Sequence, residues 1–158
     1  MTPSNLIDLL FILLSFLGVW IFSTSASALR VLIPQQITDL QTQNRVFANT
    51  VSWLANRQNH SIRISIFANF CLILLAGFLA IRNQFVMIMT VESIFLAVVL
   101  PLLIIMIFSK GISALGTYVG KTYPIQAIQL TAFPTKIGYL ILYPLLTVSY
   151  FFPNHTNR

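Results

Sequence analysis

Charged residues, and acidic ones above all, are scarce in this sequence. Asp, Glu, Lys and Arg together make up 8% of its 158 residues, and three of them are acidic, whereas an average soluble domain is about 25% charged. Hydrophobic residues make up 57%. A water-soluble chain of this size needs many more charges to cover its surface, so the composition excludes a soluble enzyme, a disordered tail and a cytosolic binding module. We therefore predict an integral membrane protein.

Cysteine and histidine are also scarce. Cys71 is the single cysteine, which excludes an intramolecular disulfide and a cysteine-rich metal site. The two histidines, His60 and His155, lie far apart in polar segments, whereas a haem held within the membrane needs paired intramembrane histidines. No glycine-rich phosphate loop precedes a helix either. We expect no enzymatic activity from this chain.

Three apolar runs are long enough, or nearly so, to cross a bilayer, because about 20 helical residues span its hydrocarbon core. Backbone groups cannot stay unpaired in lipid, so each run is predicted to be a helix. Arginines, lysines and acids mark the ends of these runs. The predicted transmembrane helices are 9–29, 64–81 and 88–109.

A fourth apolar stretch, 137–152, is shorter and has Pro144 in its middle. Its tyrosines suit the headgroup level of a membrane. We favour a juxtamembrane or re-entrant helix here, and a fourth transmembrane helix is the alternative. The predicted fold is thus a single all-α membrane domain, 1–158, with three transmembrane helices, a cytoplasmic hairpin and this C-terminal helix.

The cytoplasmic hairpin is predicted over 34–61. Pro34 can open a helix that runs to Gln43, and Asn44 can close it. A second helix is predicted over 45–57, with an apolar stripe at Phe47, Val51 and Leu54. The later segment 111–136 is rich in Gly, Thr and Pro, which predicts a broken helix or a loop, with Gly111 as a helix stop.

The net charge of +6 is first a signal of topology. Four arginines fall between the first and second predicted spans, and one falls between the second and third. Basic loops stay in the cytoplasm, so we expect segment 30–63 inside and the N-terminus outside, in a bacterial inner membrane. No basic cluster is interleaved with aromatic residues on a polar face, so we expect the lipid bilayer, and no nucleic acid, as a partner.

Polar residues inside the predicted spans are the candidates for chemistry. Glu92 is the one acid within a span, and an intramembrane carboxylate is often functional, although it could also pair with Arg82. Asn69 in the second span and four hydroxyl residues at the end of the first offer oxygen atoms of the kind that magnesium or sodium accepts; the four are Ser23, Thr24, Ser25 and Ser27. The alternative is that these small polar residues only pack helices together.

The order of several short motifs resembles the transmembrane domain of the CNNM/CorC family, also called domain of unknown function 21. That family has an FSGSETAL-like motif, a Gly-Asn motif, a Gly-Glu…Pro-Lys motif and a juxtamembrane helix with proline. The corresponding segments here are Phe22–Leu29 (FSTSASAL), Ser65–Phe70 (SIFANF), Ser109–Gly111, Ala132–Pro134 and Leu142–Leu145.

The resemblance implies a homodimer with three transmembrane helices per subunit, and magnesium transport, as export coupled to sodium. It places Ser23, Ser25 and Asn69 on cation-binding positions. Two departures weaken a magnesium site, since Ala26 stands where the motif has glutamate and Lys110 replaces an acid. We also expect the nucleotide-sensing domains to be absent.

Two functions follow as hypotheses. The first is a divergent CNNM/CorC-like protein that transports Mg²⁺ or Na⁺, or modulates that transport. The alternative is a non-transporting accessory subunit that kept the fold within a larger membrane complex.

Overall fold

The computed structural model describes residues 3–43, 47–87 and 94–150, which form six helices and no strand. This confirms the predicted all-α class. Glu92, the candidate intramembrane acid, lies outside these described residues, as does Asn44. The helices are α1 (Pro3–Val31), α2 (Pro34–Thr42), α3 (Ala48–Ala55), α4 (Gln58–Met87), α5 (Ile94–Thr122) and α6 (Pro124–Tyr150).

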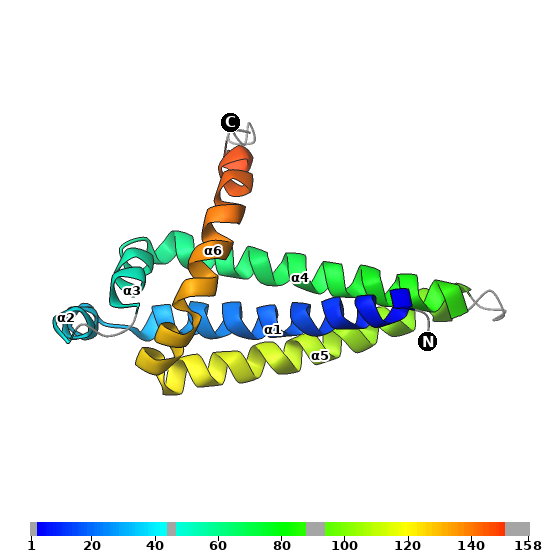
Figure 1. Ribbon diagram of the computed structural model, residues 1–158, viewed down its shortest axis with the longest axis horizontal. Helices are drawn as coiled ribbons and strands as arrows, with labels where there is room; N and C mark the ends of the chain where they lie inside the picture. The colour runs from blue at the N-terminus through cyan, green and yellow to red at the C-terminus, as the bar shows by residue number, and fades with distance from the viewer. Residues whose placement is uncertain (1–2, 44–46, 88–93, 151–158) are drawn as a thin grey trace, which may run out of the picture.

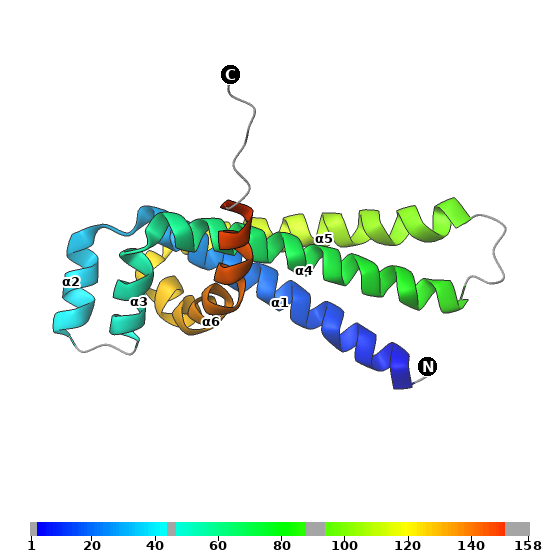
Figure 2. The same cartoon turned by 90° about the horizontal axis from the view of Figure 1, so that it is seen from above.

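Three of these helices, α1, α4 and α5, are long and apolar enough to cross a membrane, and they lie lengthwise side by side (Figures 1 and 2). Helix α4 runs antiparallel to α1. At one end of the pair Arg82 binds Asp8, and at the other end the Gln58 side chain donates to the Leu29 carbonyl. Helix α5 runs parallel to α1. The three-helix membrane bundle is therefore as predicted, with candidate spans at Asn5–Val31, Gln58–Arg82 and Val98–Thr122.

Of the two predictions for 111–136, the broken helix agrees with the structure, because α5 ends at Thr122 and α6 begins at Pro124, whereas the loop and the helix stop at Gly111 are wrong. Helix α5 continues through Lys110 and Gly111 to Thr122, so the third candidate span ends at Thr122 and not at residue 109. Gly116 and Gly120 serve close helix packing instead of breaking the helix. A Cβ atom at Gly116 would lie 2.8 Å from the Trp20 carbonyl oxygen, which is too close for any side chain.

Helix α6 contains both Pro134 and Pro144, and it runs across the three-helix bundle instead of alongside it (Figures 1 and 2). It crosses near the end where α1 finishes and α3 lies. It also begins at Pro124, well before the predicted 137. A helix that spans a membrane with the bundle would lie along it, so this geometry favours the juxtamembrane alternative over a fourth span.

The hairpin between α1 and α4 differs from its predicted limits at two points. Helix α2 starts at Pro34 as expected, with Gln43 as its C-cap. Helix α3 starts at Ala48 and not at residue 45, because Phe47 adopts a left-handed backbone (φ 62°) that no helix can continue. Helix α4 already begins at Gln58, so the hairpin ends earlier than 61.

The apolar core lies where the end of α1 meets α2, α3 and α6. Val51 and Leu54 from the predicted stripe are fully buried there, whereas Phe47 is exposed and stacks on Phe133, with ring centroids 5.9 Å apart. The core consists of Ala28, Leu29, Leu32, Leu40, Ala48, Val51, Leu54, Ala127, Ile128 and Ala132. This core fixes the hairpin and α6 against the bundle end.

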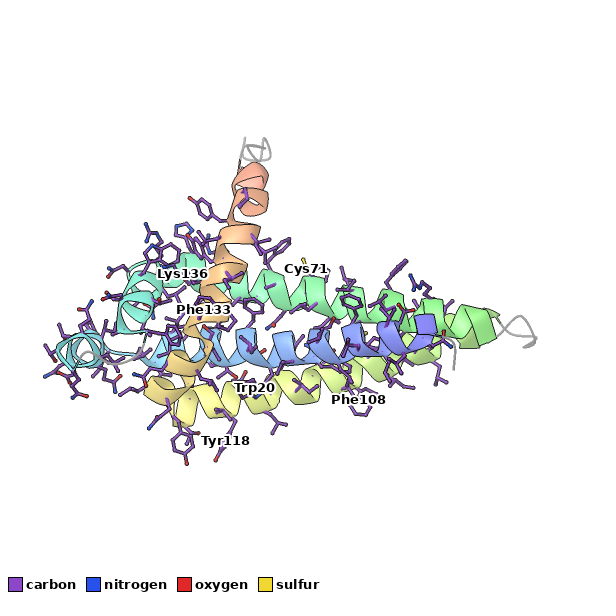
Figure 3. All side chains as sticks on the ribbon, viewed as in Figure 1. Trp20, Cys71, Phe108, Tyr118, Phe133 and Lys136 are labelled. Atoms are coloured by element: carbon purple, nitrogen blue, oxygen red, sulfur yellow. The ribbon has the colours of Figure 1, made fainter. Side chains whose placement is uncertain are left out.

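An aromatic group on α3 and α6 adjoins this core. The Trp53 ring meets Tyr139 edge-on at 4.9 Å, and the Arg57 guanidinium lies 4.5 Å from its centroid. Lys136, labelled on α6 in Figure 3, approaches the same ring at 5.5 Å. Burial and then the neighbouring Tyr143 raise the pKa of the Tyr139 phenol, while Arg57 acts to lower it. Tyr139 therefore stays neutral at physiological pH.

Candidate functional site

A set of polar side chains lies between the three candidate spans. Helix α1 is apolar for most of its length, but its residues 23–25 are buried hydroxyls. Helices α4 and α5 bring an amide and further hydroxyls toward them. We call this set the polar cluster, and its members are Ser23 and Thr24 on α1, Asn69 on α4 and Ser113 on α5.

Two hydrogen bonds connect the three helices through Ser23. The Asn69 Nδ2 group donates to Ser23 Oγ at 2.8 Å, and the hydroxyls of Ser23 and Ser113 share a hydrogen bond of 2.9 Å. Ser23 therefore stands at the centre of the cluster. The structure brings Ser23 and Asn69, both predicted candidates, into direct contact.

Two oxygen atoms of the polar cluster, Thr24 Oγ1 and Asn69 Oδ1, are buried without a hydrogen-bond partner in the described part of the chain. Ser109 Oγ, one turn before Ser113 on α5, is a third buried oxygen of this kind. Each such atom lowers the stability of the fold by about 1–3 kcal/mol. Native proteins seldom keep several unsatisfied polar atoms together, and a bound ion or water is a common reason when they do. The cluster thus holds oxygen lone pairs that are available to a ligand.

Ser25, the third predicted cation ligand, is separated from this cluster. It is fully buried, and its hydroxyl has no hydrogen-bond partner among the described residues. However, residues two apart on a helix point to different faces, so Ser25 does not share the face of Ser23. No contact seen in the structure connects Ser25 to Asn69 or Ser113.

Sequence reasoning missed the contribution of α5. Ser109 and Ser113 are one helical turn apart, and Gly116 follows on the same face against the Thr24 hydroxyl, where an added Cβ would lie 2.9 Å from Thr24 Oγ1. The signal that could have identified this face is the spacing of small residues at 109, 113, 116 and 120. It was hidden because Gly111 suggested that the helix had ended.

The two departures from the CNNM/CorC motifs can now be placed. Ala26 is buried on α1, and Lys110 is exposed on α5 although its neighbour Ser109 is buried. The ammonium group of Lys110 therefore points away from the polar cluster. Across residues whose placement is described, no group of three or more His, Cys, Asp or Glu side chains could hold a metal ion. The cluster offers neutral oxygen atoms.

At the end of the bundle away from the hairpin, Asp8 on α1 forms an ion pair with Arg82 on α4. Arg82 donates from Nη2 to Asp8 Oδ1 at 2.8 Å and from Nε to Oδ2 at 3.1 Å. The Asp8 side chain is 5% exposed and that of Arg82 is 53% exposed. This pair joins α4 to α1.

In comparisons with known proteins, the chain matches no family model and no curated protein. The resemblance to the CNNM/CorC family is carried by the short sequence motifs alone.

Proposed function

We propose that this protein takes part in the transport of a cation, or in its modulation, and that the polar cluster is where the cation binds. The observation that supports the proposal is that hydrogen bonds at Ser23 join the three candidate spans, and that each span carries a buried oxygen without a hydrogen-bond partner among the described residues. Polar groups inside membrane bundles that face other helices often mark the path of an ion. By this proposal the chain is a divergent relative of the CNNM/CorC transmembrane domain.

Sodium suits this cluster better than magnesium. Mg²⁺ gives up its water reluctantly, needs near-octahedral oxygen ligands and is usually held through carboxylates. The cluster provides a hydroxyl oxygen from Thr24 and an amide oxygen from Asn69, both neutral. A monovalent cation loses less hydration energy on entering such a site than a divalent one. Sodium is therefore the expected ion, and magnesium the weaker competitor.

The distribution of basic residues supports an orientation with the hairpin in the cytoplasm. Arg30, Arg57 and Lys136 lie at the end of the bundle where α2 and α3 are found, while Arg82 lies at the other end and is paired with Asp8. By the positive-inside rule this end faces the cytoplasm of a plasma membrane. The homodimer that the family resemblance implies is part of the same proposal.

Replacing Ser23 with alanine tests the site in proteoliposomes. Influx of ²²Na⁺ down its gradient is expected to fall about tenfold, because Ser23 accepts the hydrogen bond that orients the Asn69 amide, and leaving that buried amide without its partner costs about 1–3 kcal/mol. Ser15→Ala is the matched control, since Ser15 is also buried on α1 but donates to its own helix at the Phe11 carbonyl, at 2.8 Å. Flux in that variant should equal the flux of the unchanged chain.

Two outcomes would contradict the proposal. One is sodium and magnesium influx no faster than in liposomes without protein, which would favour the accessory-subunit alternative. The other is equal flux in the Ser23→Ala and Ser15→Ala variants, which would mean that the polar cluster only packs the helices together.

A further inference from the structure

A second site is an open groove of about 530 Å³ at the hairpin end of the bundle, away from the polar cluster. It lies where α1 ends and α4 begins. Two guanidinium groups, two side-chain amides and two isoleucines line it: Arg30, Gln58, Asn59, Ile62, Arg63 and Ile66. None of these residues is acidic. The groove therefore combines positive charge with an apolar wall.

A hydrogen bond between the two helices holds the groove in shape. The Gln58 side chain donates from Nε2 to the Leu29 carbonyl, at the last turn of α1. This contact keeps Arg30, the next residue of α1, beside the first turn of α4. Helix α4 is 30 residues long, and its N-terminal end carries a partial positive charge that adds to that of the two arginines.

The groove also has a charged end and an apolar end, in the order in which a lipid molecule has its headgroup and its acyl chains. Arg30 and Arg63 are exposed near the end of the spans, where headgroups lie. Ile66 lies one turn further into α4 than Ile62, and it is 52% exposed on the outside of the bundle. A ligand in this groove would meet positive charge at one end and hydrocarbon at the other. Free phosphate would contact only the positive charge and would leave the apolar wall uncovered.

We propose that this groove binds an anionic phospholipid. Its phosphate lies between the Arg30 and Arg63 guanidinium groups, and its acyl chain lies along Ile62 and Ile66. Guanidinium groups recognise phosphate through paired hydrogen bonds, and basic side chains near a membrane surface attract anionic lipids. This proposal does not depend on the cation function, because none of these residues belongs to the polar cluster.

Native mass spectrometry of the full chain in detergent tests the proposal. Phosphatidylglycerol and phosphatidylcholine with the same acyl chains are titrated separately, and inorganic phosphate is added as a competitor in a third arm. Phosphatidylglycerol is expected to bind more tightly than phosphatidylcholine. The Arg30→Gln/Arg63→Gln variant should weaken phosphatidylglycerol binding about thirtyfold, since each basic side chain near an anionic lipid contributes about fivefold.

Two further variants test whether the loss of binding is specific to this groove. One removes a positive charge outside the groove, and the other fills the groove while its arginines remain. Lys121→Gln removes an exposed charge near the same end but outside the groove, so binding should change less than twofold. Ile66→Trp fills the apolar wall while both arginines remain, and it should also weaken phosphatidylglycerol binding. Three results would overturn the proposal: unchanged binding in the double arginine and Ile66→Trp variants, an equal loss in Lys121→Gln, or full displacement of the lipid by millimolar inorganic phosphate.

Discussion

Replacement of Gly120 by leucine is expected to destabilise the protein by about 3 kcal/mol or more and to leave little folded chain in detergent. The reason is the close approach of α5 to α1. Even the Cβ atom of a new side chain would overlap the Thr24 carbonyl oxygen and press on Ser27 Cβ. Backbone atoms cannot move aside as a flexible side chain can, so the two helices would have to separate. Thermal unfolding followed by circular dichroism measures the effect.

Gly111→Leu is the matched control for this prediction. Gly111 lies in the same helix, and a Cβ atom there would meet nothing within 4 Å. The midpoint of its unfolding should lie within a few degrees of that of the unchanged protein. Similar losses at both positions would mean that α5 is sensitive to side-chain volume in general, and that close contact with α1 is not the cause.

The second large effect is expected when Arg82 is replaced by glutamine. This change leaves the buried Asp8 carboxylate without its charged partner, and we expect a loss of about 2–3 kcal/mol in unfolding free energy. The value lies below that of a fully buried pair because the Arg82 side chain is 53% exposed and partly solvated. Urea or detergent-mediated unfolding in micelles measures the loss.

The reverse variant completes a double-mutant cycle. Asp8→Asn should have a smaller effect, about 1 kcal/mol, because the half-exposed Arg82 can turn toward water. The Asp8→Asn/Arg82→Gln variant should then lose about 1–2 kcal/mol less unfolding free energy than the two single variants lose together. If the two single losses simply add, the Asp8–Arg82 ion pair does not contribute to stability.

Much of the membrane fold was predictable from sequence because lipid restricts the choices. Apolar runs such as 9–29 must be helices in a bilayer, and charged residues mark their ends. Pro34 gave the start of α2 correctly, because proline suits a first helical turn. The prediction that Val51 and Leu54 form an apolar stripe was also correct, since their spacing places both on one helical face.

The errors arose where tertiary contacts decide local structure. Gly111, Gly116 and Gly120 looked like helix breakers, but close packing against α1 needs glycine at the last two of these positions. The start of α3 depends on Phe47, whose left-handed backbone accompanies a ring contact with Phe133 in a distant segment. A local pattern cannot report such contacts.

The candidate site was predictable in part. Ser23 and Asn69 were identified because polar residues are rare in apolar spans, and the structure joins them by a hydrogen bond. The contribution of Ser113 was not, because its segment was assigned to a loop. The grouping of Ser25 with Ser23 came from the motif resemblance, and helical geometry places these two side chains on different faces.

The most direct test of a cation at the polar cluster is the effect of sodium on the stability of the purified chain. A ligand that binds only the folded state raises its unfolding temperature with concentration. Sodium chloride should therefore stabilise the unchanged protein more than choline chloride does at equal ionic strength, and Asn69→Leu, which removes the Asn69 amide, should abolish the difference. Equal melting curves in the two salts, or a sodium effect that persists in Asn69→Leu, would contradict a cation site in this cluster.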